Sequence, residues 1–263
     1  MAWETESKYF SGQGVVLLGD RDPVTGRGMG FLPLGNVSDL KLSIKTSVTE
    51  HKESQSGSRG VDLRLTTEVN TSVSMKLENY NAANLALSLR GATTKTVGST
   101  VTDEANKFVP GTISPFSRIG VSAVSIQKGA TALVLYVPGT ASAVTGQWDY
   151  KLNTAAGSVM WATVPKTAAL VTGDPVVVSY TFAAQSTVEA LTTSATEKYL
   201  RFEGLNTADE NKPVVVEVFR FLTDPLKDLS LISDKIQEFD MEGTVLLDAL
   251  QSGSKYFRQT VLS

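Results

Sequence analysis

The sequence predicts a mainly β protein that contains one short helix. Apolar and polar residues alternate over four segments, residues 39–49, 61–69, 72–78 and 239–247. A period of two residues is typical of strands that bury one face and expose the other to solvent. In the first segment, Leu40 and Leu42 form the apolar side, whereas Lys41 and Ser43 form the polar side.

The composition is that of a folded protein. Of the 263 residues, 41% are hydrophobic and 19% are charged, so a sizeable core can form and disorder is not expected. The net charge is −3, and no block of like charge runs along the chain. A free-standing nucleic-acid binder usually carries a basic stripe, so the sequence argues against that class. It does not argue against a protein that surrounds DNA without gripping it.

The chain contains no cysteine. Disulfides, thiolate metal sites and thiol nucleophiles are therefore excluded. The first residues lack the basic and apolar regions of a secretory signal, and no apolar run reaches the roughly 18 residues that span a bilayer. We therefore expect no contact with a membrane and folding in a cytosol.

A long polar connection, residues 50–60, joins the first two alternating strands. It contains two glycines and is too long for a tight hairpin turn. Loops of this length usually have a function of their own.

One helix is expected after the third alternating segment. Asn81 or Asn84 can cap its start, and Gly91 can end it. Leu85 and Leu87 lie on its apolar side. The helix is short, so it needs a sheet to pack on.

The middle of the chain is predicted to be a small β domain inserted into the main one. Short strands with turn residues between them are expected at residues 120–127, 132–137, 148–153, 158–161 and 176–183. This spacing is typical of a small sandwich or barrel. The predicted division is a main domain formed by residues 1–107 and 186–263, with the insert at residues 108–185.

The main domain resumes with predicted strands at residues 199–204 and 214–222. The segment that follows, residues 227–236, fits a short helix and a strand equally well. Because its neighbours are strands, we expect a strand at residues 226–230.

No motif in the sequence predicts catalysis, a cofactor or a bound metal. His51 is the only histidine, and no nucleophile motif accompanies it. The glycine-rich residues 12–14 and 26–30 lack the strand and helix context of phosphate-binding loops. Asp240 and Glu242 share one face of a predicted strand, which either is simply solvated or faces a polar channel.

Several segments, taken in order, resemble the major tail tube proteins of long-tailed, siphovirus-like bacteriophages. The resemblance covers about two thirds of the chain and lies in residues 11–22, 30–37, 50–57, 59–65, 84–91, 201–204, 214–222 and 239–243. Residues 178–184 of the insert resemble the additional β domain, Ig-like or barrel, that some of these proteins carry.

The resemblance implies a β-sandwich or partial barrel with one flanking α-helix. It also implies a structural virion protein of the tail, assembled in the host cytoplasm, and not an enzyme. Six copies form a ring, and stacked rings form the tube through which the double-stranded genomic DNA and the tape-measure protein pass. Tail terminator and distal tail proteins are the implied partners at the ends of the tube.

Two sets of site residues follow from this interpretation. The polar faces of the strands are expected to line the lumen, with the candidates Lys41, Ser43, Lys45, Asp62, Arg64, Thr66, Glu68, Asp240 and Glu242. The long loop is expected to contact the next ring, with the candidates Glu50, His51, Lys52, Glu53, Gly57, Arg59 and Gly60.

A second interpretation is a β-sandwich carbohydrate-binding or adhesive module of a phage or surface protein. Such a module normally presents exposed aromatic side chains, and Trp148 and Trp161 lie in the predicted insert. Tryptophans on strands are more often part of a core. A hydrolase is a distant third interpretation.

Overall fold

The computed structural model describes residues 9–55, 57–144 and 146–262. These residues form seventeen strands, one α-helix and one short 3-10 helix, so the predicted mainly β fold with one helix is confirmed. The first eight residues, where we expected no secretory signal, lie outside the described part. No described helix is both long and apolar enough to cross a membrane.

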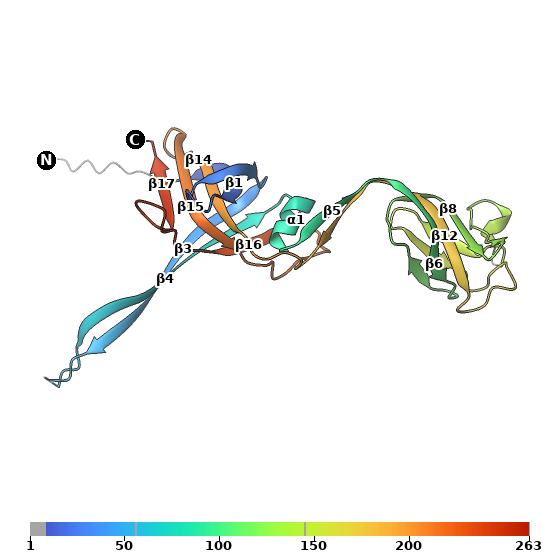
Figure 1. Cartoon of the computed structure of the whole chain (residues 1–263), viewed down its shortest axis with the longest axis horizontal. Helices are drawn as coiled ribbons and strands as arrows, with labels where there is room; N and C mark the ends of the chain where they lie inside the picture. The colour runs from blue at the N-terminus through green and yellow to red at the C-terminus, as the bar shows by residue number, and fades with distance from the viewer. Residues whose placement is uncertain (1–8, 56, 145, 263) are drawn as a thin grey trace. The chain divides into compact units, whose positions relative to one another are not determined.

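The chain forms two compact units (Figure 1). Unit 1 comprises Met1–Thr93 and Val188–Ser263, and unit 2 comprises Thr94–Thr187. The structure therefore places the first boundary of the insert before β6 (Ser99–Lys107), earlier in the chain than the predicted boundary at residue 107. The reason is that β6 pairs with β12 (Pro175–Phe182) along its length, a partner that local patterning does not reveal.

Unit 1 is built on one antiparallel sheet with the strand order β2-β1-β14-β15-β16-β4-β3. The sheet forks at β15, which pairs with β17 over its first half and with β16 over its last residues. The strands are β1 (Gly12–Arg21), β2 (Gly28–Pro33), β3 (Val37–Lys52), β4 (Val61–Leu77), β14 (Glu197–Asn206), β15 (Lys212–Thr223), β16 (Phe239–Val245) and β17 (Phe257–Val261).

The core of unit 1 consists of alternate residues of these strands. Met75 and Leu77 of β4, Leu200 of β14, Phe221 of β15 and Met241 of β16 are buried in one cluster. Their spacing of two residues is that of strands with one buried face. The alternation seen in the sequence therefore identifies the buried side of β16 and of the last part of β4, from Val73 to Leu77, correctly.

Helix α1 (Ala82–Ser88) packs on this core through Leu87. Of the two predicted caps, Asn81 is the one used, because its side-chain oxygen accepts a 2.8 Å hydrogen bond from the Asn84 backbone N–H. Asn84 is buried instead, and its amide donates to the Leu34 carbonyl oxygen at 2.8 Å. The left-handed residue after the helix is Arg90, with a φ of 48°, and not Gly91.

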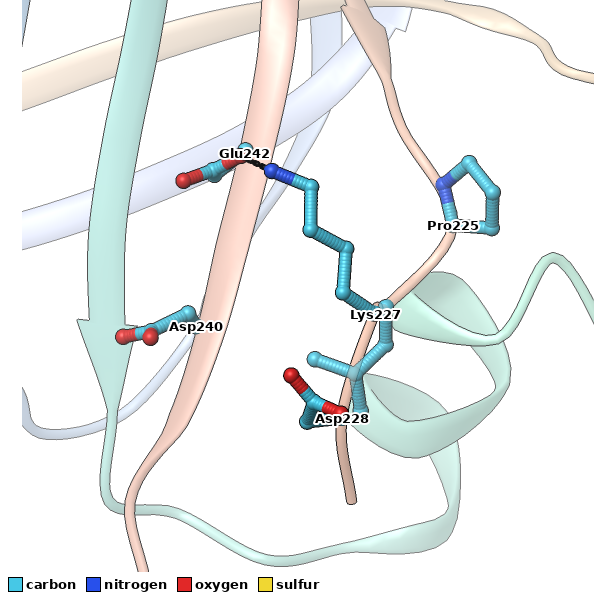
Figure 2. A pocket seen from close by; sticks show the side chains of 6 residues that line it. Pro225, Lys227, Asp228, Asp240 and Glu242 are labelled. Atoms are coloured by element: carbon cyan, nitrogen blue, oxygen red, sulfur yellow. Dashed lines mark hydrogen bonds and ion pairs between the residues drawn. The ribbon is translucent and has the colours of Figure 1, made fainter.

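The strand expected at residues 226–230 is not formed. Residues 224–238 connect β15 to β16 without regular secondary structure, and Figure 2 shows the part that begins at Pro225 beside β16. The first part of this segment lies beside the end of α1, where the Leu226 N–H donates to the Ser88 carbonyl oxygen at 2.7 Å. Strands β2 and β17 were not predicted, since both are short and lack clear alternation.

Unit 2 is a small sandwich of two antiparallel sheets. One sheet has the order β10-β11-β7 and the other has the order β6-β12-β8-β9. Their strands are β7 (Ile113–Pro115), β8 (Val121–Lys128), β9 (Thr131–Ala132), β10 (Tyr150–Asn153) and β11 (Ser158–Trp161), besides β6 and β12. The strand expected at residues 132–137 shrinks to β9, and η1 (Ala141–Ala143) follows it.

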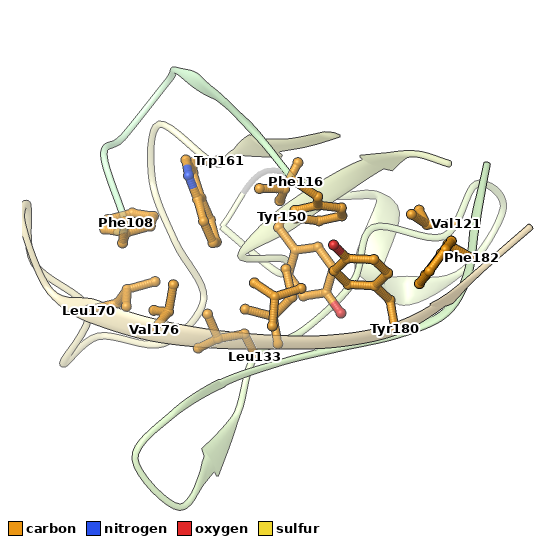
Figure 3. Packing of buried hydrophobic residues seen from close by; sticks show 13 residues of the cluster. Phe108, Phe116, Val121, Leu133, Tyr150, Trp161, Leu170, Val176, Tyr180 and Phe182 are labelled. Atoms are coloured by element: carbon orange, nitrogen blue, oxygen red, sulfur yellow. The ribbon is translucent and has the colours of Figure 1, made fainter. Parts of the chain in front are cut away.

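Aromatic side chains from both sheets fill the space between them (Figure 3). Trp161 of β11 meets Phe108 edge to face, with ring centroids 5.4 Å apart, and Tyr180 of β12 stacks on Phe116 at 5.2 Å. Such pairs add to the free energy of apolar burial. The chain enters and leaves unit 2 through β5 (Ala92–Thr96) and β13 (Gln185–Glu189), which pair with each other.

Candidate functional site: a projecting hairpin and a polar sheet face

The β3–β4 hairpin extends well beyond the sheet of unit 1 (Figure 1). Strand β4 pairs with β16 only between Thr71 and Leu77, so residues 44–70 have no third strand beside them. We call residues 44–70 the arm. At about 3.3 Å per residue, the strands of the arm reach roughly 25–30 Å past the sheet. None of its described residues is buried.

The arm carries apolar side chains that nothing in the described chain covers. They are Ile44, Val61, Leu63, Leu65 and Val69, with exposed fractions between 41% and 58%. A two-stranded hairpin alone is marginally stable at best in water. Several exposed aliphatic side chains on one hairpin indicate an interaction site.

An irregularity at Thr67 exchanges the two faces of β4 along the arm. Ser47 pairs with Glu68, but Val48 pairs with Thr66, so Thr67 is an extra residue that has no partner on β3. Its hydroxyl donates to the Ser47 carbonyl oxygen at 3.2 Å. Because side chains alternate with a period of two, one extra residue moves every later side chain of β4 to the other face.

The residues predicted to line a lumen from the two long strands therefore do not share one face. Lys41, Ser43, Lys45 and Glu68 lie on one side, whereas the register places the predicted Arg64 and Thr66 on the opposite side. On the face of Lys41 and Ser43, Leu65 lies opposite Thr49 and Leu63 lies opposite His51. Asp62 is a second extra residue, and its carboxylate meets His51 Nδ1 at 2.7 Å.

Nearer the body of unit 1, the sheet does present one continuous polar face. Asp240 lies opposite Lys76 and Glu242 opposite Ser74, and Ser74 in turn pairs with Lys41 on β3. The charges are mixed and mostly paired: Lys41 with Asp39, Lys76 with Glu238 at 3.6 Å, and Lys227 with Glu242 at 2.5 Å.

A shallow recess of about 80 Å³ lies on this polar face (Figure 2). Lys227 spans it to reach Glu242, and this hydrogen bond raises the pKa of Lys227. Asp228 and Asp240 line the same recess. Within the described ranges, no group of three or more acidic or histidine side chains could hold a metal ion.

The tip of the arm is a compact turn. Residues 50–52, expected to belong to a loop, extend β3 instead. The Glu53 N–H donates to the Gly60 carbonyl oxygen at 2.8 Å, and the Glu53 carboxylate accepts from the Ser58 hydroxyl at 2.7 Å. Gly57 and Arg59 have positive φ angles of 79° and 49°. Ser56 lies outside the described residues.

The charges at the tip are of both signs. Glu50 pairs with Arg64 at 3.7 Å, whereas the side chains of Lys52 and Arg59 form no ion pair with any described residue. The arm contains as many basic as acidic residues, so the tip presents charges of both signs, and Lys52 and Arg59 are available for a contact with another surface.

An open groove of about 820 Å³ lies where the strands of the arm enter the sheet. Its walls include Val16 of β1, Leu40 and Leu42 of β3, Phe202 of β14 and Val216 of β15. These side chains continue the buried core outward, so the apolar interior of unit 1 is open on one side. The groove and the arm share β3, which makes their apolar surfaces continuous.

A family model matches residues 9–260 of this chain. The chain belongs to the family described as "Protein of unknown function UCP028589". No curated protein matches it. The match covers both units, so the inserted unit is part of what the family model describes.

The enzyme and adhesive interpretations rest on His51, Trp148 and Trp161. His51 lies on the exposed arm, and its ring bonds only to Asp62. Trp161 is 1% exposed. Trp148 is half-buried against Tyr136, and Lys151 Nζ lies 4.9 Å from its ring centroid. Neither tryptophan forms an exposed aromatic platform.

The sequence predicted the strands of the arm but not their exposure. Its alternation predicted the strands, but it also predicted that Leu63 and Leu65 would be buried. Exposure depends on whether another layer covers the strand, and the sequence of the strand carries no sign of that. Asp240 and Glu242 were identified as one face from spacing alone, and the structure adds Lys76 and Lys227 as their partners.

Proposed function

We propose that this protein is a self-assembling structural subunit, the major tail tube protein of a long-tailed bacteriophage. The arm is the observation that supports this proposal most directly. A hairpin with half-exposed aliphatic residues along both strands would promote unwanted association of an isolated monomer. It suits a subunit whose neighbour covers the hairpin.

The edges of the sheet support the same proposal. Strand β3 is an edge strand along its entire length of sixteen residues, and β2 and β17 have one open side each. Long open edges invite pairing with another chain. In a closed ring of identical copies, each open edge meets a neighbour, and the aliphatic groove between β1 and β3 is covered as well.

The polar sheet face is the proposed wall of the lumen. In this proposal Lys41, Ser43, Lys45, Asp240 and Glu242 face the channel. Their charges are of both signs and partly neutralise one another. Double-stranded DNA can slide along such a wall, because strong pairing with phosphates requires a net excess of unpaired cations.

The tip of the arm is the proposed contact to the next ring. Lys52 and Arg59 supply positive charge there, and rings stacked head to tail would bring them against a different surface of the neighbouring subunit. Six copies per ring, the tape-measure protein in the lumen and capping proteins at the tube ends belong to the proposal through the family resemblance.

Electron microscopy of the purified protein tests this proposal. We expect rings or tubes with a central channel. A variant in which Asn-Gly replaces residues 53–60 should keep the far-ultraviolet circular dichroism of the parent and lose the tubes, while rings can persist. A parent protein that stays monomeric at high concentration, or a tip variant that forms normal tubes, contradicts the respective part of the proposal.

A further inference from the structure

A basic pocket of about 410 Å³ lies on the face of unit 1 opposite the core. Its floor is Glu217 of β15, whose carboxylate accepts hydrogen bonds from Arg201 Nη1 at 2.9 Å and Arg258 Nη2 at 2.6 Å. The Tyr199 hydroxyl donates to the same carboxylate at 3.2 Å. The acceptor capacity of Glu217 is therefore largely used within the pocket.

One guanidinium of this pocket, that of Arg27, has no hydrogen-bond partner among the described residues. Arg201 also bonds to Glu203 at 2.7 Å, so two arginines and two glutamates balance one another. The third arginine, Arg27, lines the pocket but forms no hydrogen bond through its side chain with any described residue. The pocket thus has a net positive charge and donors left over for one anion.

The pocket fits a single carboxylate better than a nucleic acid. Glu203 and Glu217 lie among the arginines and would repel a run of phosphates. The wall beside Arg27 is aromatic, with the Phe31 and Tyr199 rings edge to face at 5.7 Å. A carboxylate carried by an apolar peptide segment matches both features.

The chain itself contains such a segment between β15 and β16. Leu231, Ile232 and Ile236 are almost entirely exposed, with Ile232 at 94%. Between the two isoleucines lies Asp234, whose carboxylate forms no hydrogen bond or ion pair with any described residue. Several aliphatic side chains so fully exposed in one short segment indicate a docking element.

The segment and the pocket lie on different sides of unit 1. The segment starts at the end of α1, whereas the pocket includes Arg258 of β17, and Figure 1 shows α1 and β17 well apart. Two complementary surfaces at separate places on one chain join copies head to tail, and repetition gives a ring or a filament. Charge and apolar character both match across this contact.

We infer that Asp234 of one copy inserts between Arg27 and Arg258 of the next copy, with Ile232 and Ile236 against Phe31. This inference rests on the proposed self-assembly, and it names a contact within that assembly that is separate from the arm. It also assigns a role to the irregular connection between β15 and β16.

The absence of cysteine makes a cross-linking test specific. The single variants Arg27→Cys and Asp234→Cys are mixed and treated with a short bismaleimide, because an arginine–aspartate pair spans more than the roughly 7 Å reach of a disulfide. We expect covalent dimers that contain one copy of each variant. Glu210→Cys, another exposed acidic position of unit 1, mixed with Arg27→Cys is the matched control. Equal dimer yields in both mixtures would overturn the inference.

A charge exchange gives an independent readout. Arg27→Asp and Asp234→Arg alone should each reduce the assembled fraction at least about tenfold, which corresponds to loss of one well-placed ion pair with its apolar surroundings. The double variant should recover most of the assembled fraction of the parent. Single variants that assemble like the parent would contradict the contact while leaving the proposed function intact. A parent that never assembles would instead contradict the proposed function.

Discussion

Unit 2 closes its own core, whereas unit 1 leaves part of its apolar surface open. In unit 2, large aromatic residues such as Trp161 and Tyr180 are enclosed between two sheets. The exposed aliphatic residues of unit 2 lie mostly in its connecting segments, where single exposed residues are ordinary. In unit 1 the apolar residues of β3 and β4 run from the buried core into an open groove and on to the arm.

This difference shows that alternation reports the presence of an apolar face but not what covers it. Val73 and Leu65 lie on the same strand and have similar side chains, yet Val73 is 1% exposed and Leu65 is 54% exposed. Val73 is covered by other residues of the buried cluster of unit 1. We propose that Leu65 is covered by a neighbouring copy, so the comparison separates residues that stabilise the fold from residues that support assembly.

The largest expected effect is on assembly. Leu65→Asp places a charge next to Leu63, on the face of the arm that also carries Thr49 and His51, and should abolish ring and tube formation, because a carboxylate buried without a partner against a neighbouring copy is strongly unfavourable. Thr66→Asp adds the same charge one residue away on the opposite face and should be tolerated better. Sedimentation velocity measures the assembly of both variants, and urea denaturation of the monomer should show a change in the free energy of unfolding of no more than about 0.5 kcal/mol for either.

If Leu65→Asp assembled normally while Thr66→Asp did not, the assignment of the two faces would be wrong. If both failed, the whole arm would be enclosed by the neighbour, and the comparison between a covered face and a free face would have to be dropped.

The second effect is on the stability of unit 2. Trp161→Ala removes a buried side chain that touches Phe108 and Tyr150, and it should cost about 3–5 kcal/mol of the free energy of unfolding. Met160→Ala, the adjacent residue on the outer face of β11, should cost about 1 kcal/mol or less. Urea denaturation of each variant gives these values, and similar losses for both would contradict the enclosed core.

Local patterning predicted the elements that bury one face within the chain. Strands β3, β4 and β16 and the cap at Asn81 were all accessible from residue spacing and capping chemistry. Strand β6 was not predicted, because its polar sequence, Ser99–Lys107, is typical of a loop. Only its pairing with β12 makes it a strand. Strand β17 was missed for the same reason, since its partner, Val214–Val218 of β15, lies far earlier in the sequence.

The candidate site was less predictable than the fold. The extra residue at Thr67 leaves the sequence alternation almost unchanged, so the exchange of faces along the arm appears only in the pairing register. The Glu217 pocket joins β2, β14, β15 and β17, and its residues are distant in the sequence. A pocket whose residues come from four strands forms only when the complete sheet has formed, and no short sequence motif predicts it.

The smallest expected effect is a difference in acid sensitivity. Three carboxylates of unit 1 that arginines hold have a lowered pKa: Glu197 with Arg220, Asp248 with Arg21, and Glu217 with Arg258 and Arg201. The Arg220 hydrogen bond lowers the pKa of Glu197 below 4.5. Burial disfavours the charged forms of Glu217 and Asp248, but their arginine partners outweigh it and lower both pKa values.

A carboxyl group with a lowered pKa in the folded state stabilises the fold above its unfolded pKa, and this contribution is lost as the pH falls through the folded value. Unit 1 should therefore begin to lose stability as the pH drops below about 4.5, the ordinary value for glutamate. In the described part of unit 2, Asp174 is the carboxylate whose pKa is lowered, through its hydrogen bond with Lys128. Hydrogen exchange followed by mass spectrometry resolves the two units, and protection should fail in unit 1 first. Glu217→Gln should flatten the pH dependence of unit 1 alone, whereas simultaneous loss of protection in both units would show that the ion pairs do not distinguish them.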